Sequence, residues 1–89
     1  ISGDSMEPEY HNGEIAWIQQ KDSICNGEVG IFYLNGDAYI KKLHDEPDGL
    51  FLISLNKKYK PIAIQESDSF KIFGKVVGKC DASDIPGFQ

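Results

Sequence analysis

Short apolar runs separated by clusters of turn residues repeat along the whole chain. The runs are rich in β-branched and aromatic side chains, a composition typical of strands. No window shows the sustained apolar spacing of about 3.6 residues that marks an amphipathic helix. The pattern therefore predicts an all-β domain of short, mostly antiparallel strands, at residues 14–19, 29–34, 38–43, 50–55, 62–64 and 70–77.

The residues between these runs predict how the strands are joined. Asn35-Gly36 lies between two predicted strands, and both residue types tolerate positive φ, so we expect a tight hairpin there. The polar stretch 44–49 is expected to be a loop that joins the next hairpin, and 81–89 a polar tail. Neither an internal repeat nor a linker divides the 89 residues, so we expect a single domain over 1–89.

The charge balance limits the function classes. Fourteen acidic residues face nine lysines, the net charge is -5, and arginine is absent. Proteins that read DNA grooves usually carry a basic face and use arginine for base contacts. A nucleic-acid-binding role for these residues is therefore disfavoured, and a further segment would have to supply it. Apolar runs also stay far below the ~20 residues that span a bilayer.

The first candidate for chemistry is the segment Gly-Asp-Ser-Met-Glu-Pro at residues 3–8. A serine between glycine and proline suits a constrained loop that exposes its hydroxyl. Such a loop can also direct backbone N–H groups at a developing oxyanion. Taken alone the pattern is weak evidence, because serine, glycine and aspartate are common in ordinary turns.

The second candidate is a pair of lysines inside an apolar strand. Because side chains alternate between faces, Lys41 shares a face with Tyr39 and Leu43, and Lys42 lies on the opposite face. A desolvated lysine loses its proton more readily and can then activate a serine hydroxyl. Alternation alone does not choose between the two lysines, and we interpret Lys42 as a solvated surface residue.

These segments, taken in order, resemble one known family. The matching stretches are Gly-Asp-Ser-Met-Glu-Pro (3–8), Asn-Gly-Glu-Val (26–29), Tyr-Ile-Lys-Lys-Leu (39–43), Asn-Lys-Lys-Tyr-Lys-Pro-Ile (56–62) and Phe-Lys-Ile-Phe-Gly-Lys-Val-Val-Gly (70–78). Together they are similar to the C-terminal Ser–Lys self-cleaving domain of LexA, UmuD and phage repressors. The resemblance covers nearly the whole chain and implies the LexA-like, signal-peptidase-like all-β fold.

The resemblance also implies roles for individual residues. Ser5 matches the family's nucleophile and Lys41 its general base. The backbone N–H groups of Ser5 and a neighbour would form the oxyanion hole, in the loop that holds Asp4 and Met6. Met6 would line the site, and Glu7 and Pro8 would shape the loop. The last predicted strand resembles the family's dimerisation strand, with candidate contacts at Phe70, Ile72, Phe73 and Val76.

For the whole protein, the resemblance implies a cytoplasmic transcriptional repressor that forms a homodimer and needs no cofactor or metal. It would bind operator DNA through an N-terminal domain and respond to the RecA–single-stranded-DNA filament. The family cleaves itself at an Ala-Gly or Cys-Gly bond before the serine, and neither dipeptide occurs here. We therefore expect the cleavage linker and the DNA-binding domain to lie outside this sequence. The fragment would then cleave in trans or serve only to dimerise.

Other functions remain open at this stage. Signal peptidases share a Ser-Met-x-Pro loop and a lysine-bearing strand. A Ser–His–Asp hydrolase would need His11 or His44, which we interpret as solvated loop residues. The two histidines with Cys25 and Cys80 match no standard metal spacing, and we expect both cysteines to be free thiols. The acidic turn 45–48 lacks the calcium-binding loop pattern.

Overall fold

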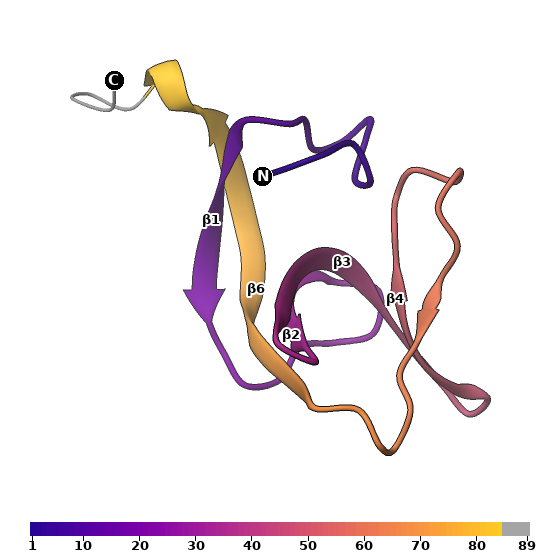
Figure 1. Ribbon diagram of the computed structural model, residues 1–89. Coiled ribbons are helices and arrows are strands. Elements are labelled where there is room, and N and C mark those ends of the chain that lie inside the picture. Colours follow the sequence, from indigo (N-terminus) through magenta and orange to yellow (C-terminus); the bar gives the residue numbers. More distant parts are fainter. Residues whose placement is uncertain (85–89) are drawn as a thin grey trace.

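The computed structural model describes residues 1–84. Within them six strands form an antiparallel sheet in the order β1-β6-β2-β3-β4-β5 (Figure 1). The predicted all-β fold is confirmed. The elements are β1 (Glu14–Gln20), β2 (Val29–Leu34), β3 (Asp37–Glu46), β4 (Gly49–Ile53), β5 (Ile62–Ala63), β6 (Phe70–Asp81) and the short 3₁₀ turn η1 (Ala82–Asp84).

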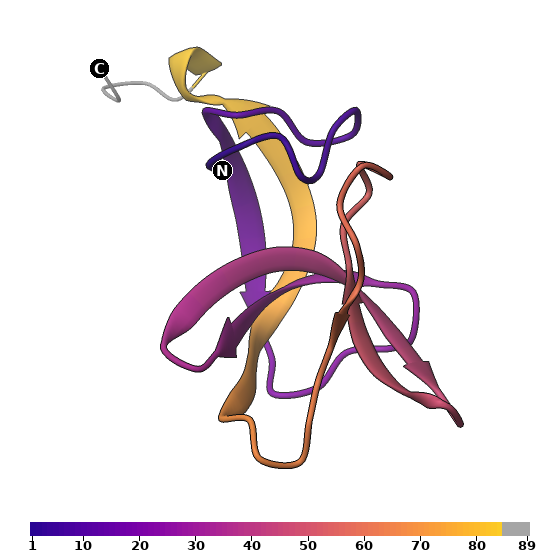
Figure 2. The same cartoon turned by 45° about the vertical axis from the view of Figure 1, so that its right-hand side comes forward.

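The long strand β6 connects the two halves of the sheet. Its first part pairs with β2 and its second part with β1. The register shifts once in the β2–β6 ladder, where Phe73 is an extra residue without a direct partner on β2. It shifts once in the β1–β6 ladder, where Val77 is the extra residue. Such bulges bend a strand and increase its twist. Figures 1 and 2 show the result, a strongly curved sheet in which β2 and β3 curl away from the β1–β6 arm.

The core lies against the inner face of β2, β3 and β4. Phe32 and Leu34 are two positions apart on β2, so their side chains lie on the same face. They pack with Leu43 and Leu52 as a buried cluster. The ring of Phe70 stacks on Phe32, with 5.7 Å between the ring centroids. The side of β3 that carries Leu43 therefore faces the interior of the domain.

The four residues predicted at a dimer interface have different surroundings. Phe70 and Ile72 pack against the buried cluster, and Val76 is buried. Phe73, on a bulge, contacts the edge of the Tyr33 ring at 5.7 Å between centroids. All four side chains are thus already partly or fully covered within one copy.

The Asn35-Gly36 hairpin is confirmed. The φ angles of 50° and 89° at these two residues are those of the tight turn that joins β2 to β3. The Asn35 side chain also donates to Asp68 Oδ1 at 2.9 Å and accepts the backbone N–H of Ser69 at 2.9 Å. The hairpin tip is thereby attached to the residues that precede β6.

The prediction of a loop over residues 44–49 is wrong in its extent. β3 continues to Glu46, which pairs with Gly49, so only two residues form the turn. The β3–β4 hydrogen-bond ladder continues through polar residues because only one face of this ladder needs apolar side chains. His44 therefore lies in a strand opposite Phe51, half-buried, with their rings 5.7 Å apart, and is not a solvated loop residue.

The ends of other strands also differ from the prediction, most of all those of β6 and β4. β6 continues to Asp81 because its last residues pair with the start of β1. The predicted tail at 81–89 is therefore a strand end followed by η1, and 85–89 lie outside the described residues. β4 ends at Ile53, so Ser54 leaves the sheet. Over residues 1–84, no helix has the length and apolar character needed to cross a membrane.

Candidate active site

Residues 1–13, here called the Ser5 loop, form a series of turns over one end of the sheet (Figure 1). The backbone N–H of Glu7 donates to the Asp4 carbonyl at 3.1 Å, and that of Tyr10 donates to the Met6 carbonyl at 2.9 Å. The Met6 side chain is 1% exposed and is buried in the body of the domain. Ser5 lies within the turn between Asp4 and Glu7 and is half-buried.

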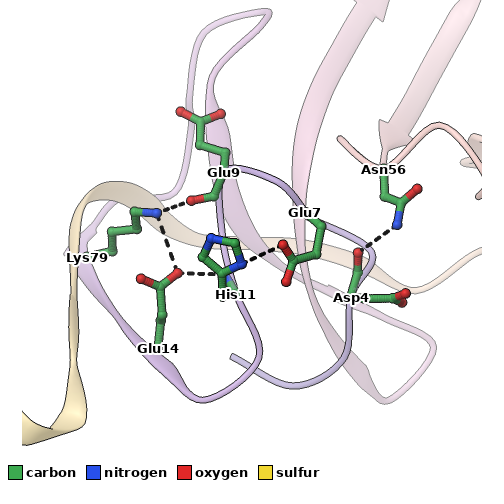
Figure 3. Close-up of polar contacts among 7 residues, drawn as sticks. All are labelled: Asp4, Glu7, Glu9, His11, Glu14, Asn56 and Lys79. Atoms are coloured by element: carbon green, nitrogen blue, oxygen red, sulfur yellow. Dashed lines mark hydrogen bonds and ion pairs between the residues drawn. The ribbon is translucent and has the colours of Figure 1, made fainter.

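One side of the Ser5 loop is attached to β1 and β6 by charged groups (Figure 3). His11 Nδ1 lies 2.5 Å from Glu7 Oε2, and the His11 backbone N–H donates to Glu14 Oε1 at 2.6 Å. The Lys79 ammonium donates to the Glu9 carbonyl and also lies 3.4 Å from Glu14 Oε1. The His11 N–H bond is the largest cause that lowers the pKa of Glu14.

The other side of the loop is attached to residues 54–61, here called the Ser54 segment. Asn56 donates its backbone N–H to the Ser5 carbonyl at 2.9 Å and its side-chain amide to the Asp4 carbonyl at 3.0 Å. The Asp4 carboxylate accepts the Tyr59 hydroxyl and pairs with Lys58 at 2.7 Å. Hydrogen bonds from Lys58 and Tyr59 lower the pKa of Asp4.

Lys41 lies in the middle of β3, on the face that carries Leu43. It is only 7% exposed, whereas Lys42 is exposed. Burial lowers the pKa of Lys41 below the ordinary value of a lysine, because the charged form loses its hydration. Its Nζ is 2.9 Å from Ser5 Oγ and 2.9 Å from Ser54 Oγ. The fold thus brings Ser5 and Lys41 into hydrogen-bond contact.

These groups lie in an open cleft of about 440 Å³ between the Ser5 loop and the Ser54 segment. Asp4 lines the cleft. The prediction that Met6 lines the site is wrong, because its side chain is 1% exposed and is not among the lining residues. Apolar and aromatic surface flanks the hydroxyl and amine groups, from Tyr39, Tyr59 and Ile62. A side chain or backbone segment of a peptide can therefore reach the Ser5 hydroxyl from solvent.

A larger depression of about 580 Å³ lies elsewhere, lined by residues 20–22 and 71–73. It contains lysine and aspartate side chains but no serine, threonine or cysteine among its lining residues. The Ser5 cleft is smaller, yet it alone of the two contains a hydroxyl nucleophile beside a buried amine. We therefore take the Ser5 cleft as the candidate active site.

Three residues that line this cleft or bond to its Ser5 loop were not singled out from the sequence. Asn56 and Tyr59 belonged to the motif at 56–62, but no role was assigned to them. Ser54 was not identified at all. The available signal was that Ser54 is the one polar residue in the apolar run 50–55, a position where a hydroxyl needs a partner.

The competing candidates do not meet in the cleft. His11 pairs with Glu7 on the exposed side of the Ser5 loop, and His44 lines a separate small cleft with Phe51. Cys25 and Cys80 are free thiols. Among residues 1–84, no three His, Cys, Asp or Glu side chains gather in a group that would hold a metal ion.

Comparison with known families identifies the domain. The family model described as Peptidase S24-like matches residues 1–77. The chain belongs to the Peptidase S24-like family. The match confirms the resemblance that the sequence motifs at 3–8 and 39–43 indicated. The family is one of serine peptidases, so the chain is a serine-peptidase-type domain.

The S24 chain is also similar to several LexA repressors. It is 38% identical over 79 residues to the LexA repressor of Leptospira biflexa, covering 88% of this chain and 38% of that protein. It is 34% identical over 79 residues to that of Clostridium perfringens, covering 88% and 37%. For Carboxydothermus hydrogenoformans the identity is 37% over 81 residues, covering 88% and 39%. The S24 chain thus spans less than two-fifths of the length of these relatives.

Proposed function

We propose that this S24 domain is the self-cleaving and dimerising part of a LexA-like transcriptional repressor, with Ser5 as nucleophile and Lys41 as general base. The observation that carries the proposal is the 2.9 Å contact between Lys41 Nζ and Ser5 Oγ, made by a lysine that is 7% exposed. A serine hydroxyl becomes a useful nucleophile only beside a group that takes its proton. A buried amine does this once it is neutral, and burial favours the neutral form.

The chemistry proceeds in two steps. Neutral Lys41 takes the Ser5 proton while the Ser5 oxygen attacks the scissile carbonyl carbon. The tetrahedral oxyanion is stabilised by backbone N–H groups of the Ser5 loop, among them that of Ser5 itself. The C–N bond then breaks, the Lys41 ammonium gives its proton to the leaving amine, and an acyl-enzyme remains. Water, deprotonated by Lys41, hydrolyses the ester and restores the Ser5 hydroxyl.

The substrate is a peptide bond in the linker that joins this domain to the rest of the repressor. The name of the relatives, LexA repressor, supports this reading of the full protein. Operator DNA is bound through a DNA-binding domain outside this sequence, in keeping with the net charge of -5 and the absence of arginine. The repressor is cytoplasmic, and the RecA–single-stranded-DNA filament is the partner that induces cleavage.

Homodimerisation through β6 is the second part of the proposal. Three large apolar side chains on the adjacent strands β1, β6 and β2 are exposed to solvent, Trp17 at 50%, Val77 at 58% and Tyr33 at 39%. A second copy would cover them together with Phe73, which already contacts Tyr33. Sedimentation equilibrium should report a dimer, and Phe73→Glu should shift it toward monomer. A wild-type chain that sediments as a monomer at high micromolar concentration would refute this part.

Cleavage is tested in the full-length chain, incubated between pH 7 and pH 10 and followed by mass spectrometry. Ser5→Ala and Lys41→Ala should abolish the cleaved products while the domain still folds. Lys42→Ala is the matched control, because Lys42 is the exposed neighbour on the same strand, and it should cleave at nearly the wild-type rate. Equal loss in both lysine variants, or products from Ser5→Ala, would contradict the assignment. His11→Ala and His44→Ala should retain cleavage.

A further inference from the structure

Ser54 is the third polar group at the centre of the cleft. It is 7% exposed, and its Oγ lies 2.9 Å from Lys41 Nζ. Within residues 1–84, Lys41 and Ser54 are the two buried polar or charged residues, and each is a hydrogen-bond partner of the other. A buried hydroxyl costs free energy unless it is bonded. The bond to Lys41 therefore satisfies the buried Ser54 hydroxyl.

The sheet register explains why these two residues meet. Lys42 pairs with Ile53 in the antiparallel ladder of β3 and β4. The next position along that ladder brings Lys41 opposite Ser54, at the point where β4 has ended. Directly opposed residues of an antiparallel pair have their Cβ atoms about 5 Å apart on one face. Ser54 is held from its other side as well, because Asn56 two residues later bonds to the Ser5 carbonyl.

We infer that Ser54 is a positioning residue that orients the Lys41 amine toward Ser5. The inference rests on the proposed function. A neutral primary amine has one lone pair and two N–H bonds, and it rotates freely about the Cε–Nζ bond. When Ser54 Oγ accepts one N–H, the rotation is restricted and the lone pair can point at the Ser5 hydroxyl. Productive proton transfer requires that geometry.

The same contact affects the charged form of Lys41. A hydrogen bond from an ammonium to a hydroxyl is stronger than one from a neutral amine. Ser54 therefore stabilises the ammonium more than the amine and opposes part of the effect of burial. Removing the hydroxyl should weaken catalysis and, in addition, move the protonation midpoint of Lys41 to lower pH.

The test compares Ser54→Ala, Ser54→Thr and Ser67→Ala in the full-length chain. Ser67 is exposed and serves as the matched serine control, and Ser54→Thr keeps the hydroxyl. Ser54→Ala should lower the plateau cleavage rate roughly ten- to hundredfold, the size expected for a misaligned catalytic group. Its pH midpoint should move to lower pH. Ser54→Thr should recover most of the rate, and Ser67→Ala should match the wild type.

A separate readout keeps this inference distinct from the proposed function. Lys41 Nζ is titrated by nitrogen-15 NMR in the Ser5→Ala variant, with and without Ser54→Ala, and melting temperatures are recorded. A positioning role predicts a lower Lys41 midpoint when Ser54 is replaced, even if no cleavage of any chain is detected. A merely structural role would lower the melting temperature and leave the midpoint unchanged. An unchanged midpoint together with an unchanged cleavage rate overturns the inference.

Discussion

The backbone N–H of Asn56 donates a hydrogen bond to the carbonyl oxygen of Ser5 at 2.9 Å. This bond joins the Ser5 loop to the Ser54 segment, and Figures 1 and 2 both show the two segments facing each other at the same end of the sheet. The Ser5 loop is held from its other side by Lys79 of β6. The hydroxyl is thus held against Lys41 by contacts from two directions rather than by the loop's own turns alone.

Cleavage should accelerate with pH. Burial lowers the pKa of Lys41, so its neutral, basic form becomes populated at a lower pH than that of an exposed lysine. The rate should rise with the titration of one proton and level off above the pKa of Lys41 in the folded protein. Cleavage by the full-length chain, measured in overlapping buffers from pH 6 to pH 11, gives the profile. A rate that falls through this range, or does not change, would contradict a lysine base.

Lys41→Met should stabilise the domain at neutral pH. The pKa of Lys41 is lower in the folded than in the unfolded chain, so between the two values the unfolded chain binds more protons. Wild-type stability therefore rises with pH through that window, and below it the buried ammonium carries its full cost. At pH 7 the cost of burying the ammonium should exceed the cost of leaving the Ser54 hydroxyl without its lysine partner, so the free energy of unfolding should rise by about 1 kcal/mol.

Urea denaturation of the Lys41→Met variant at pH 7 and near pH 10 measures this effect. The advantage over wild type should shrink at the higher pH, because there the wild-type amine is already neutral. Lys42→Met is the matched control, and since Lys42 is exposed it should change stability little at either pH. A Lys41→Met variant that is less stable at pH 7 would show that the polar contacts of the amine outweigh its desolvation.

Tyr59→Phe should slow cleavage with little loss of stability. The Tyr59 hydroxyl donates to the Asp4 carboxylate and helps to hold the residue that precedes Ser5. One net hydrogen bond is worth about 1 kcal/mol, which corresponds to roughly a fivefold lower rate if the loop becomes less ordered. Tyr59 is 41% exposed, so the melting temperature should change little. Single-turnover cleavage rates give the comparison.

The matched control for this variant is Tyr33→Phe. Tyr33 is exposed to a similar degree, 39%, lies on β2 and is not among the residues that line the Ser5 cleft. It should leave the cleavage rate unchanged. If both tyrosine variants slow cleavage equally, the Asp4 contact is not the cause.

Gly74→Ala should destabilise the sheet where β1 and β2 both meet β6. A Cβ at Gly74 would lie 2.5 Å from Ile18 Cγ2 and 2.6 Å from the Gln19 carbonyl oxygen. The second of these is backbone and cannot move without breaking the β1–β6 pairing. We expect a loss of about 1–3 kcal/mol in the free energy of unfolding, the usual range for overpacking. Denaturant unfolding measures it.

Gly78→Ala, on the same strand, is the control for Gly74→Ala. A Cβ at Gly78 would lie 3.7 Å from Trp17 Cδ1, an ordinary contact distance. This variant should be as stable as the wild type or slightly more so, because alanine reduces the freedom of the unfolded chain. Equal losses at the two positions would indicate a general intolerance of substitution in β6.

Much of the architecture was predictable because its causes are local. Short runs rich in β-branched and aromatic side chains marked the strands, and Asn35-Gly36 marked the hairpin, since two adjacent residues decide that turn. The same local rules failed at strand ends. β3 extends past its predicted end to include His44, and β4 ends before Ser54. The length of a strand depends on the partner strand that it pairs with as well as on its own composition.

The candidate site was predictable only in its parts. The sequence by itself determined a serine in a constrained loop and two lysines on opposite faces of an apolar strand. Only the tertiary structure decided that Lys41 faces inward, that its Nζ reaches Ser5, and that Ser54 lies opposite it. The physical reason is that strand alternation and turn preference act between neighbours in sequence, whereas burial and hydrogen-bond partners depend on which distant segments the sheet register brings together.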